Sequence, residues 1–246
     1  MKLLAALAVS LAVTYSGLLP ARPTQASAQP NEQFVDPPGP ITPEETKLLE
    51  AARAALGSRS ISEILTDHTF NALHPRTEFR ELIRDHAKEG PVTIAAPDEP
   101  GERLTVTGIF RDEKGKPLPG VLMYFYQTSA KGWYAATAAH VRANSGDHKH
   151  ARLFGYLKTG ADGKFEIQTI RPGGYPRSDL PQHIHIVANL EGYREVYSEF
   201  LFDDDPRLTK EQREQAKKNG FIVSPVTKGV DGTLKAEYVV VMKNER

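Results

Sequence analysis

The feature that most constrains the fold is a succession of short strand-like segments from about Val92 to the C-terminus. Residues 121–127 form an apolar run rich in aromatic side chains, and residues 236–242 have the composition of a final strand. The sequence at 160–163, Gly-Ala-Asp-Gly, is typical of a hairpin turn. Several short strands separated by turns favour packed sheets over a helical bundle. We therefore predict a mainly β fold, an antiparallel β-sandwich over residues 92–246.

A helical pattern precedes these strands. Thr42 and Glu45 have the spacing of a capping box, and Pro43 occupies the first helical position between them. Apolar residues then recur at helical spacing. We predict a Pro-rich linker over residues 29–42 and a helical N-terminal segment over residues 43–91. Such helices pack on the main domain or on a second subunit and carry no chemistry themselves.

The first residues have the pattern of a cleavable signal peptide. Lys2 precedes an apolar stretch, and Ala26, Ser27 and Ala28 form a small-residue cleavage site. Polar residues interrupt the apolar stretch, which disfavours a stable membrane span. We predict that residues 1–28 are removed and that the mature protein is secreted or periplasmic, without membrane attachment.

Composition narrows the classes of protein that need to be considered. The sequence contains no cysteine, which excludes a disulfide framework and a lipoprotein anchor. It contains 31 basic and 31 acidic residues, and this balance gives no indication of nucleic acid as a partner. A small-molecule substrate is therefore the expected partner, and a homo-oligomer is left open.

The segment that begins at His183 is the most informative about chemistry. Residues two apart in a strand point to the same face, so His183 and His185 direct two imidazoles to one place, whereas Ile184 faces the other way. Imidazole binds iron, copper, zinc and nickel. Tyr134 and Tyr175 lie upstream, and a tyrosine is anionic at neutral pH only if a strong cation replaces its proton. Two phenolates and two imidazoles suit a ferric ion, because two negative charges offset most of its charge.

The surrounding sequence resembles the intradiol ring-cleavage dioxygenases, the family of catechol 1,2-dioxygenase and protocatechuate 3,4-dioxygenase. Residues 108–121 look like the family's opening hairpin, and residues 126–134 look like its W-Q-x-x-x-x-G-x-Y segment, with Tyr126 in place of the usual tryptophan. Residues 159–172 follow the family's T-D-x-x-G-x-Y-x-F-x-T-I-x-P stretch. The resemblance covers roughly residues 95–246, and it lies in the order and spacing of these motifs.

The resemblance implies that Tyr134, Tyr175, His183 and His185 ligate non-haem Fe(III), and that Tyr175 leaves the metal when the substrate chelates. It implies an oxidoreductase that opens a catechol-type aromatic diol between its hydroxylated carbons. Both atoms of O2 then enter a muconate-type dicarboxylic acid. Catechol, protocatechuate and hydroxyquinol differ by one group, and the sequence does not distinguish among them.

The chain departs from the family's pattern at positions close to the ligands. The family places an arginine three residues before the first ligand histidine, and Leu180 stands there instead. We predict that either Arg177 or Arg152 supplies the charge that meets an anionic substrate. Glu199 stands where a glutamine is common, and the loop between the second tyrosine and the first histidine is short.

Two other functions are compatible with parts of the sequence. Segments such as Gly115–Val121 also occur in transthyretin-like and carboxypeptidase-regulatory-like sandwiches, so the alternative is a non-catalytic secreted binding module. A zinc hydrolase is a third hypothesis, which the two tyrosines disfavour because they are unusual among zinc ligands.

A second His-x-His motif, His148 and His150, follows Asp147 in a charged segment. This context predicts a solvated loop. The alternative is a lid or substrate contact beside the iron, because the motif lies between the two tyrosines, and His140 is open to the same role.

Overall fold

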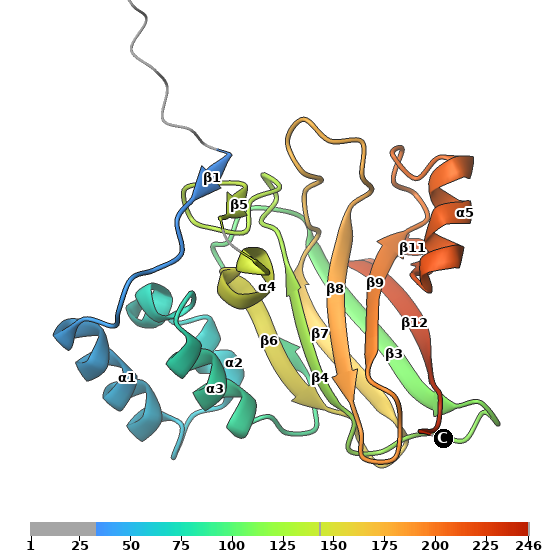
Figure 1. Ribbon diagram of the computed structural model, residues 1–246. Coiled ribbons are helices and arrows are strands. Elements are labelled where there is room, and N and C mark those ends of the chain that lie inside the picture. Colours follow the sequence, from blue (N-terminus) through green and yellow to red (C-terminus); the bar gives the residue numbers. More distant parts are fainter. Residues whose placement is uncertain (1–32, 143, 246) are drawn as a thin grey trace, which may run out of the picture. The chain divides into compact units, whose positions relative to one another are not determined.

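The computed structural model describes residues 33–142 and 144–245. The predicted signal peptide, residues 1–28, lies outside the described residues, as does the start of the predicted linker. The described chain is mainly β and contains two five-stranded sheets (Figure 1). In order across the first sheet, the strands are β10 (Ile222–Ser224), β9 (Val196–Phe202), β8 (His183–Asn189), β4 (Leu122–Gln127) and β6 (Leu153–Lys158). The second sheet contains β11 (Val226–Lys228), β12 (Leu234–Met242), β3 (Arg103–Asp112), β7 (Lys164–Ile170) and β2 (Val92–Thr93).

Both sheets mix parallel and antiparallel pairs, so the prediction of an antiparallel sandwich is wrong in this respect. Strand β4 is antiparallel to β6 and β8, and β3 is antiparallel to β7. The pairs β12–β3, β10–β9 and β2–β7 are parallel. In each parallel pair the two strands are separated along the chain by a helix or by other strands, and no tight turn joins them. Local alternation predicts a strand and its faces but not its partner, which is why the sequence did not reveal these pairs.

Aromatic side chains fill the space between the two sheets. Strand β12 alternates buried and exposed residues along its whole length, as expected when one face of a sheet covers a core. The ring of Phe200 on β9 stacks on Tyr238 of β12 with 4.1 Å between centroids, and on Phe165 of β7 with 5.9 Å. The Tyr238 hydroxyl donates to the carbonyl of Leu201 at 2.9 Å. This packing holds the site-bearing sheet against the other sheet.

The helices lie mainly before the sheets in sequence. They are α1 (Pro43–Ala55), α2 (Ile61–Leu65), the 3-10 helix η1 (His68–Leu73), α3 (Thr77–Asp85), α4 (Gly146–His150) and α5 (Lys210–Asn219). The capping box at Thr42 is formed, with the Glu45 side chain accepting from the Thr42 amide. Helix α3 lies beside strand β6 at the edge of the first sheet (Figure 1). Among the described residues, we find no helix with the length and apolar character needed to cross a membrane. The predicted domain boundaries stay predictions.

A buried arginine of helix α3 connects this helix to helix α4 and strand β4. Arg80 of α3 is 5% exposed and has no carboxylate partner among the described residues. Its guanidinium donates to the carbonyls of Ala151 at 2.9 Å and His148 at 3.2 Å, and to the Tyr124 hydroxyl. It also lies 3.8 Å from the ring centroid of Phe154. Carbonyl acceptors satisfy a buried cation without an ion pair, and here they fix the position of α4.

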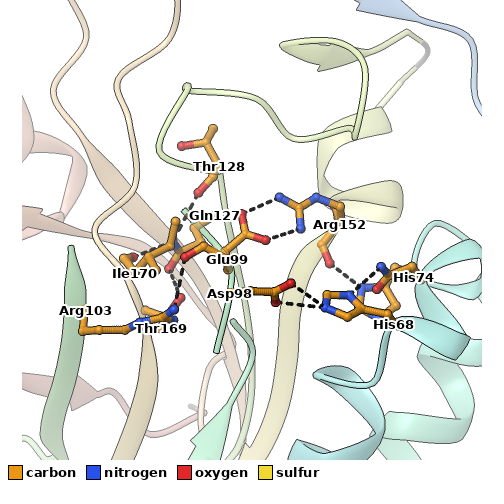
Figure 2. A network of polar contacts seen from close by, with 11 residues as sticks. His68, His74, Asp98, Glu99, Arg103, Gln127, Thr128, Arg152, Thr169 and Ile170 are labelled. Carbon is orange, nitrogen blue, oxygen red and sulfur yellow. Dashed lines mark hydrogen bonds and ion pairs between the residues drawn. The ribbon is translucent and has the colours of Figure 1, made fainter. Parts of the chain in front are cut away.

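His74 is a second buried polar residue at this boundary. Its Nδ1 donates to the Arg152 carbonyl at 2.7 Å, which Figure 2 shows within a larger polar network. Its Nε2 has no hydrogen-bond partner within the part of the chain that is described. Burial is the main cause that lowers the pKa of His74 to about 4. The folded protein therefore keeps this imidazole neutral.

We predict that the free energy of unfolding falls as the pH is lowered from about 6.5 to about 4. In this window the unfolded chain binds a proton at His74 that the folded chain excludes, which costs at most about 3 kcal/mol. Urea unfolding at pH 7 and pH 4.5 measures the loss. A His74→Leu variant should lose less stability on acidification than the wild type. Equal losses would show that His74 does not contribute.

Candidate metal centre

Two histidines of β8 present the same ring nitrogen to one point. His183 is 8% exposed, and its Nδ1 donates to the Pro181 carbonyl at 2.7 Å. The Nδ1 of His185 lies 3.3 Å from the Glu199 carboxylate, which β9 carries directly opposite in the sheet. Because a carbonyl and a carboxylate only accept, each Nδ1 carries the hydrogen and each Nε2 keeps a lone pair. The two Nε2 atoms lie 3.1 Å apart.

The two tyrosines bring their hydroxyls to the same point from separate loops. Tyr134 Oη lies 2.6 Å from Tyr175 Oη and 2.9 Å from His185 Nε2. Tyr175 Oη lies 2.8 Å from His183 Nε2 and 3.3 Å from His185 Nε2. The four residues predicted as ligands from the sequence therefore converge, although more than 40 residues separate the first tyrosine from the second histidine.

The four atoms have fewer hydrogens than close contacts. The two hydroxyls supply two protons, whereas five of the atom pairs lie within 3.3 Å of each other. At least three contacts then bring lone pair against lone pair, which costs free energy in a buried place. If a cation were bound among the four atoms, their lone pairs would point at the cation and no longer at one another. The donor set, two imidazoles and two oxygens, fits a ferric ion, and we find no misfit between these residues and that metal.

Burial sets the protonation of these groups when no cation is bound. Burial, the largest cause, raises the pKa of Tyr134 and of Tyr175 well above the ordinary value. Burial also lowers the pKa of His185, and the neighbouring His183 adds to this effect. The tyrosines are thus neutral and the imidazole uncharged, and phenolates form here only if a cation replaces their protons.

Glu199 raises the question of a second ligand set. Donor atoms of His183, His185 and Glu199 lie within 4.8 Å of one another, a spacing compatible with a metal ion. The carboxylate, however, lies against Nδ1 of His185, on the side of the ring away from the tyrosines. Glu199 is therefore placed to orient His185 rather than to join the four converging atoms. The sequence marked this position only as a departure from glutamine, because its partner depends on the register of two strands.

A cleft of about 570 Å3 opens beside the four residues. Its walls include Tyr134, Tyr175 and His185, together with residues that sequence reasoning did not assign to the site: Phe34, Tyr126, Val141, Arg142, Ser145 and Gly146. Phe34 comes from strand β1 (Phe34–Val35), which pairs with β5 (His140–Val141), and only this pairing reveals it. Tyr126 stacks on His185 with 4.5 Å between ring centroids. The segment predicted as a solvated loop is helix α4, and His148 lines the cleft.

The two arginines predicted to meet the substrate's charge do not line this cleft. Arg152 forms two 2.7 Å contacts with the Glu99 carboxylate, as Figure 2 shows. Arg177 is exposed and has a left-handed backbone conformation, with φ of 60°. Leu180, at the family's arginine position, is 48% exposed. The catalytic role of either arginine stays a prediction. Arg152 would first have to leave the Glu99 carboxylate.

A glycine permits the close approach of the two tyrosine loops. The Gly173 amide donates to the Ser129 carbonyl at 2.9 Å. A Cβ atom at Gly173 would lie 2.4 Å from the carbonyl oxygen of Ala130, which is closer than any real contact. The loop before Tyr175 can therefore lie against the loop before Tyr134 only because residue 173 has no side chain.

We predict that Gly173→Ala separates the two tyrosine loops and destabilises the protein by about 2 kcal/mol, the usual scale of a steric insertion. Thermal unfolding and metal titration of the purified variant measure the two effects, and both stability and metal affinity should fall. Gly39→Ala is the matched control, because an added Cβ there meets no atom within 4 Å. Full metal affinity in Gly173→Ala would contradict the role of this contact.

Comparison with known proteins places this arrangement in a family. A family model described as "Dioxygenase" matches residues 78–242. A catechol 1,2-dioxygenase from Acinetobacter lwoffii is 27% identical over 181 residues, which cover 61% of this chain and 56% of the relative. The protocatechuate 3,4-dioxygenase beta chain from Burkholderia cepacia is 33% identical over 121 residues, 44% of this chain and 48% of the relative. The chain thus spans about half the length of the curated relatives it matches.

Solved structures show a similar fold. The dioxygenase domain of a dioxygenase carbohydrate-binding protein fusion from the cellulolytic bacterium Streptomyces sp. SirexAA-E has a TM-score of 0.50 and 25% identity, over 65% of this chain and 90% of that one. A catechol 1,2-dioxygenase from Acinetobacter sp. ADP1 has a TM-score of 0.52 at 15% identity, over 84% of this chain and 80% of that one, and shows the fold alone. With the family model matching about two thirds of its residues, this chain belongs to the intradiol ring-cleavage dioxygenase family.

Proposed function

We propose that this protein is a non-haem Fe(III) intradiol dioxygenase that cleaves a catechol-type aromatic diol with O2 to a muconate-type dicarboxylic acid. The observation that carries the proposal is the convergence of two phenol oxygens and two imidazole nitrogens beside an open cleft. Family membership and relatives named as catechol and protocatechuate dioxygenases support the same reaction. They do not favour the alternative of a non-catalytic binding module.

The two tyrosines have different environments, and this difference assigns them different tasks. Tyr134 is 1% exposed and packed within the core, so it is suited to remain in place. Tyr175 is only partly buried, so it would be the ligand that an incoming diol displaces. A bound ferric ion would supply the positive charge that favours deprotonation of the diol's hydroxyls. A displaced Tyr175 phenolate would be a base able to accept the proton of one of the two hydroxyls.

Three neighbouring groups orient the two histidines. Glu199 and the Pro181 carbonyl hold the two imidazoles with Nε2 toward the centre. The Tyr126 ring covers one face of His185, which limits its rotation and excludes water from that side. Fixed ligands lower the reorganisation needed when the substrate binds.

Iron content and turnover test the proposal directly. We expect about one iron per chain, a visible tyrosinate–Fe(III) absorption band, and O2 uptake with ring-opened product from at least one of catechol, protocatechuate and hydroxyquinol. His183→Ala and His185→Ala should lose both iron and colour, because each removes a ligand. Ile184→Val, on the opposite face of β8, should retain iron and cost about 1 kcal/mol of stability.

Three results would contradict the proposal. They are stoichiometric zinc in a colourless protein, full iron retention in both histidine variants, and an iron-loaded wild type that opens no diol. The last result alone would favour the binding-module alternative, because the metal site would then be present without turnover.

The export prediction also enters the proposed function. Residues 1–28 have the signal-peptide pattern, and this pattern supports a protein that acts outside the cytoplasm. Expression of the full sequence in a bacterial host, followed by N-terminal sequencing of the protein from the periplasm or medium, tests it. The expected mature protein begins at Gln29, and a cell-associated protein that still begins at Met1 would contradict export.

A further inference from the structure

The cleft contains polar side chains that the proposed metal centre does not use. Arg142 lies at the rim and is paired with Asp36. His148 packs edge-on against two tyrosine rings, and burial, the main cause, lowers its pKa. Arg142 is therefore already paired, and the charged form of His148 is disfavoured. His140 and Asp147 form a further polar pair, and both line the cleft.

His140 is held in one orientation by Asp147. Its Nδ1 lies 2.8 Å from one carboxylate oxygen of Asp147, and the other carboxylate oxygen accepts from the Val141 amide at 2.7 Å. An ionised carboxylate only accepts hydrogen bonds, so Nδ1 carries the hydrogen and Nε2 keeps its lone pair. No described residue makes a hydrogen bond to this Nε2. The pair thus presents an oriented acceptor at the wall of the cleft.

The imidazole lies next to the displaceable tyrosine. The ring of His140 meets the ring of Tyr175 edge-on, with 4.9 Å between centroids. The ring of Phe34 also lies beside His140, with 5.5 Å between centroids. The backbone is fixed as well, because the His140 amide donates to the Gln33 carbonyl at 2.9 Å within the β1–β5 pair. A planar aromatic ligand that reaches Tyr175 therefore passes an apolar ring and an imidazole acceptor on one wall.

We propose that His140, oriented by Asp147, is a substrate-binding residue beside Tyr175. Its Nε2 accepts a hydrogen bond from the diol hydroxyl whose proton Tyr175 does not take. This inference rests on the proposed function and adds to it a residue of this chain that contacts the substrate. The cleft has no guanidinium at Leu180, so a directional contact from His140 orients the diol from a different wall. Phe34 contributes an apolar face for the ring of the same ligand.

Anaerobic titration of the iron-loaded protein with catechol tests the proposal before any turnover occurs. The visible band reports binding, and the variants are His140→Leu, which removes the acceptor, and His140→Gln, which keeps one at a similar reach. We expect His140→Leu to retain iron and to weaken catechol binding about tenfold, the scale of one lost hydrogen bond. His140→Gln should recover part of that loss, and Asp147→Asn should weaken binding by a smaller factor.

The matched control is His68→Gln, because His68 forms a similar pair with Asp98, at 2.9 Å, outside the cleft. It should bind catechol as the wild type does. Wild-type affinity in His140→Leu, with iron retained, would overturn the inference, as would loss of iron in both His140 variants. A wild type that binds catechol but opens no diol would overturn the proposed function and leave the binding comparison intact. A wild type that takes up no iron would overturn both.

Discussion

The central constraint in this structure is that four polar atoms meet at one buried point with too few hydrogens to satisfy their contacts. Two hydroxyls and two imidazole nitrogens meet at distances of 2.6–3.3 Å, and the hydroxyls can satisfy only two of the five contacts. A protein interior tolerates such a cluster when a cation is shared among the donors, because bare lone pairs in contact are costly without water. The cluster therefore points to metal binding more directly than the residue types do.

The sheets and the loops contribute differently to this point. Strand β8 lies between β4 and β9, so the two histidines are held by hydrogen bonds on both sides. The tyrosines come from loops, and these loops approach through backbone contacts such as the one at Gly173. Two fixed histidines on a strand, with a buried tyrosine and a partly buried tyrosine on loops, would suit a centre that retains a metal and still admits a ligand.

The outer wall of the cleft is formed by elements that lie far in sequence from the four converging residues. Strand β1 brings Phe34 to the site, and Arg80 of α3 fixes helix α4 through the carbonyls of His148 and Ala151. The helical segment thus has a structural connection to the cleft, although it supplies no ligand. Leu180 stands at the family's arginine position, so the polar side chains of this wall, such as His140 and Asp147, are the groups available to a ligand in the cleft.

The sequence by itself determined the strand-like segments, the faces of His183 and His185, and the order of the four residues predicted as ligands. These follow from local periodicity and motif spacing, which short-range backbone geometry controls. Only the tertiary structure decided which strands pair in parallel, that Glu199 faces His185, that Arg152 is bound to Glu99, and that His140 lies against Tyr175. Each of these depends on the partner that a segment finds across the fold. Such partners are chosen by the packing of distant residues, and no local pattern in the chain records that choice.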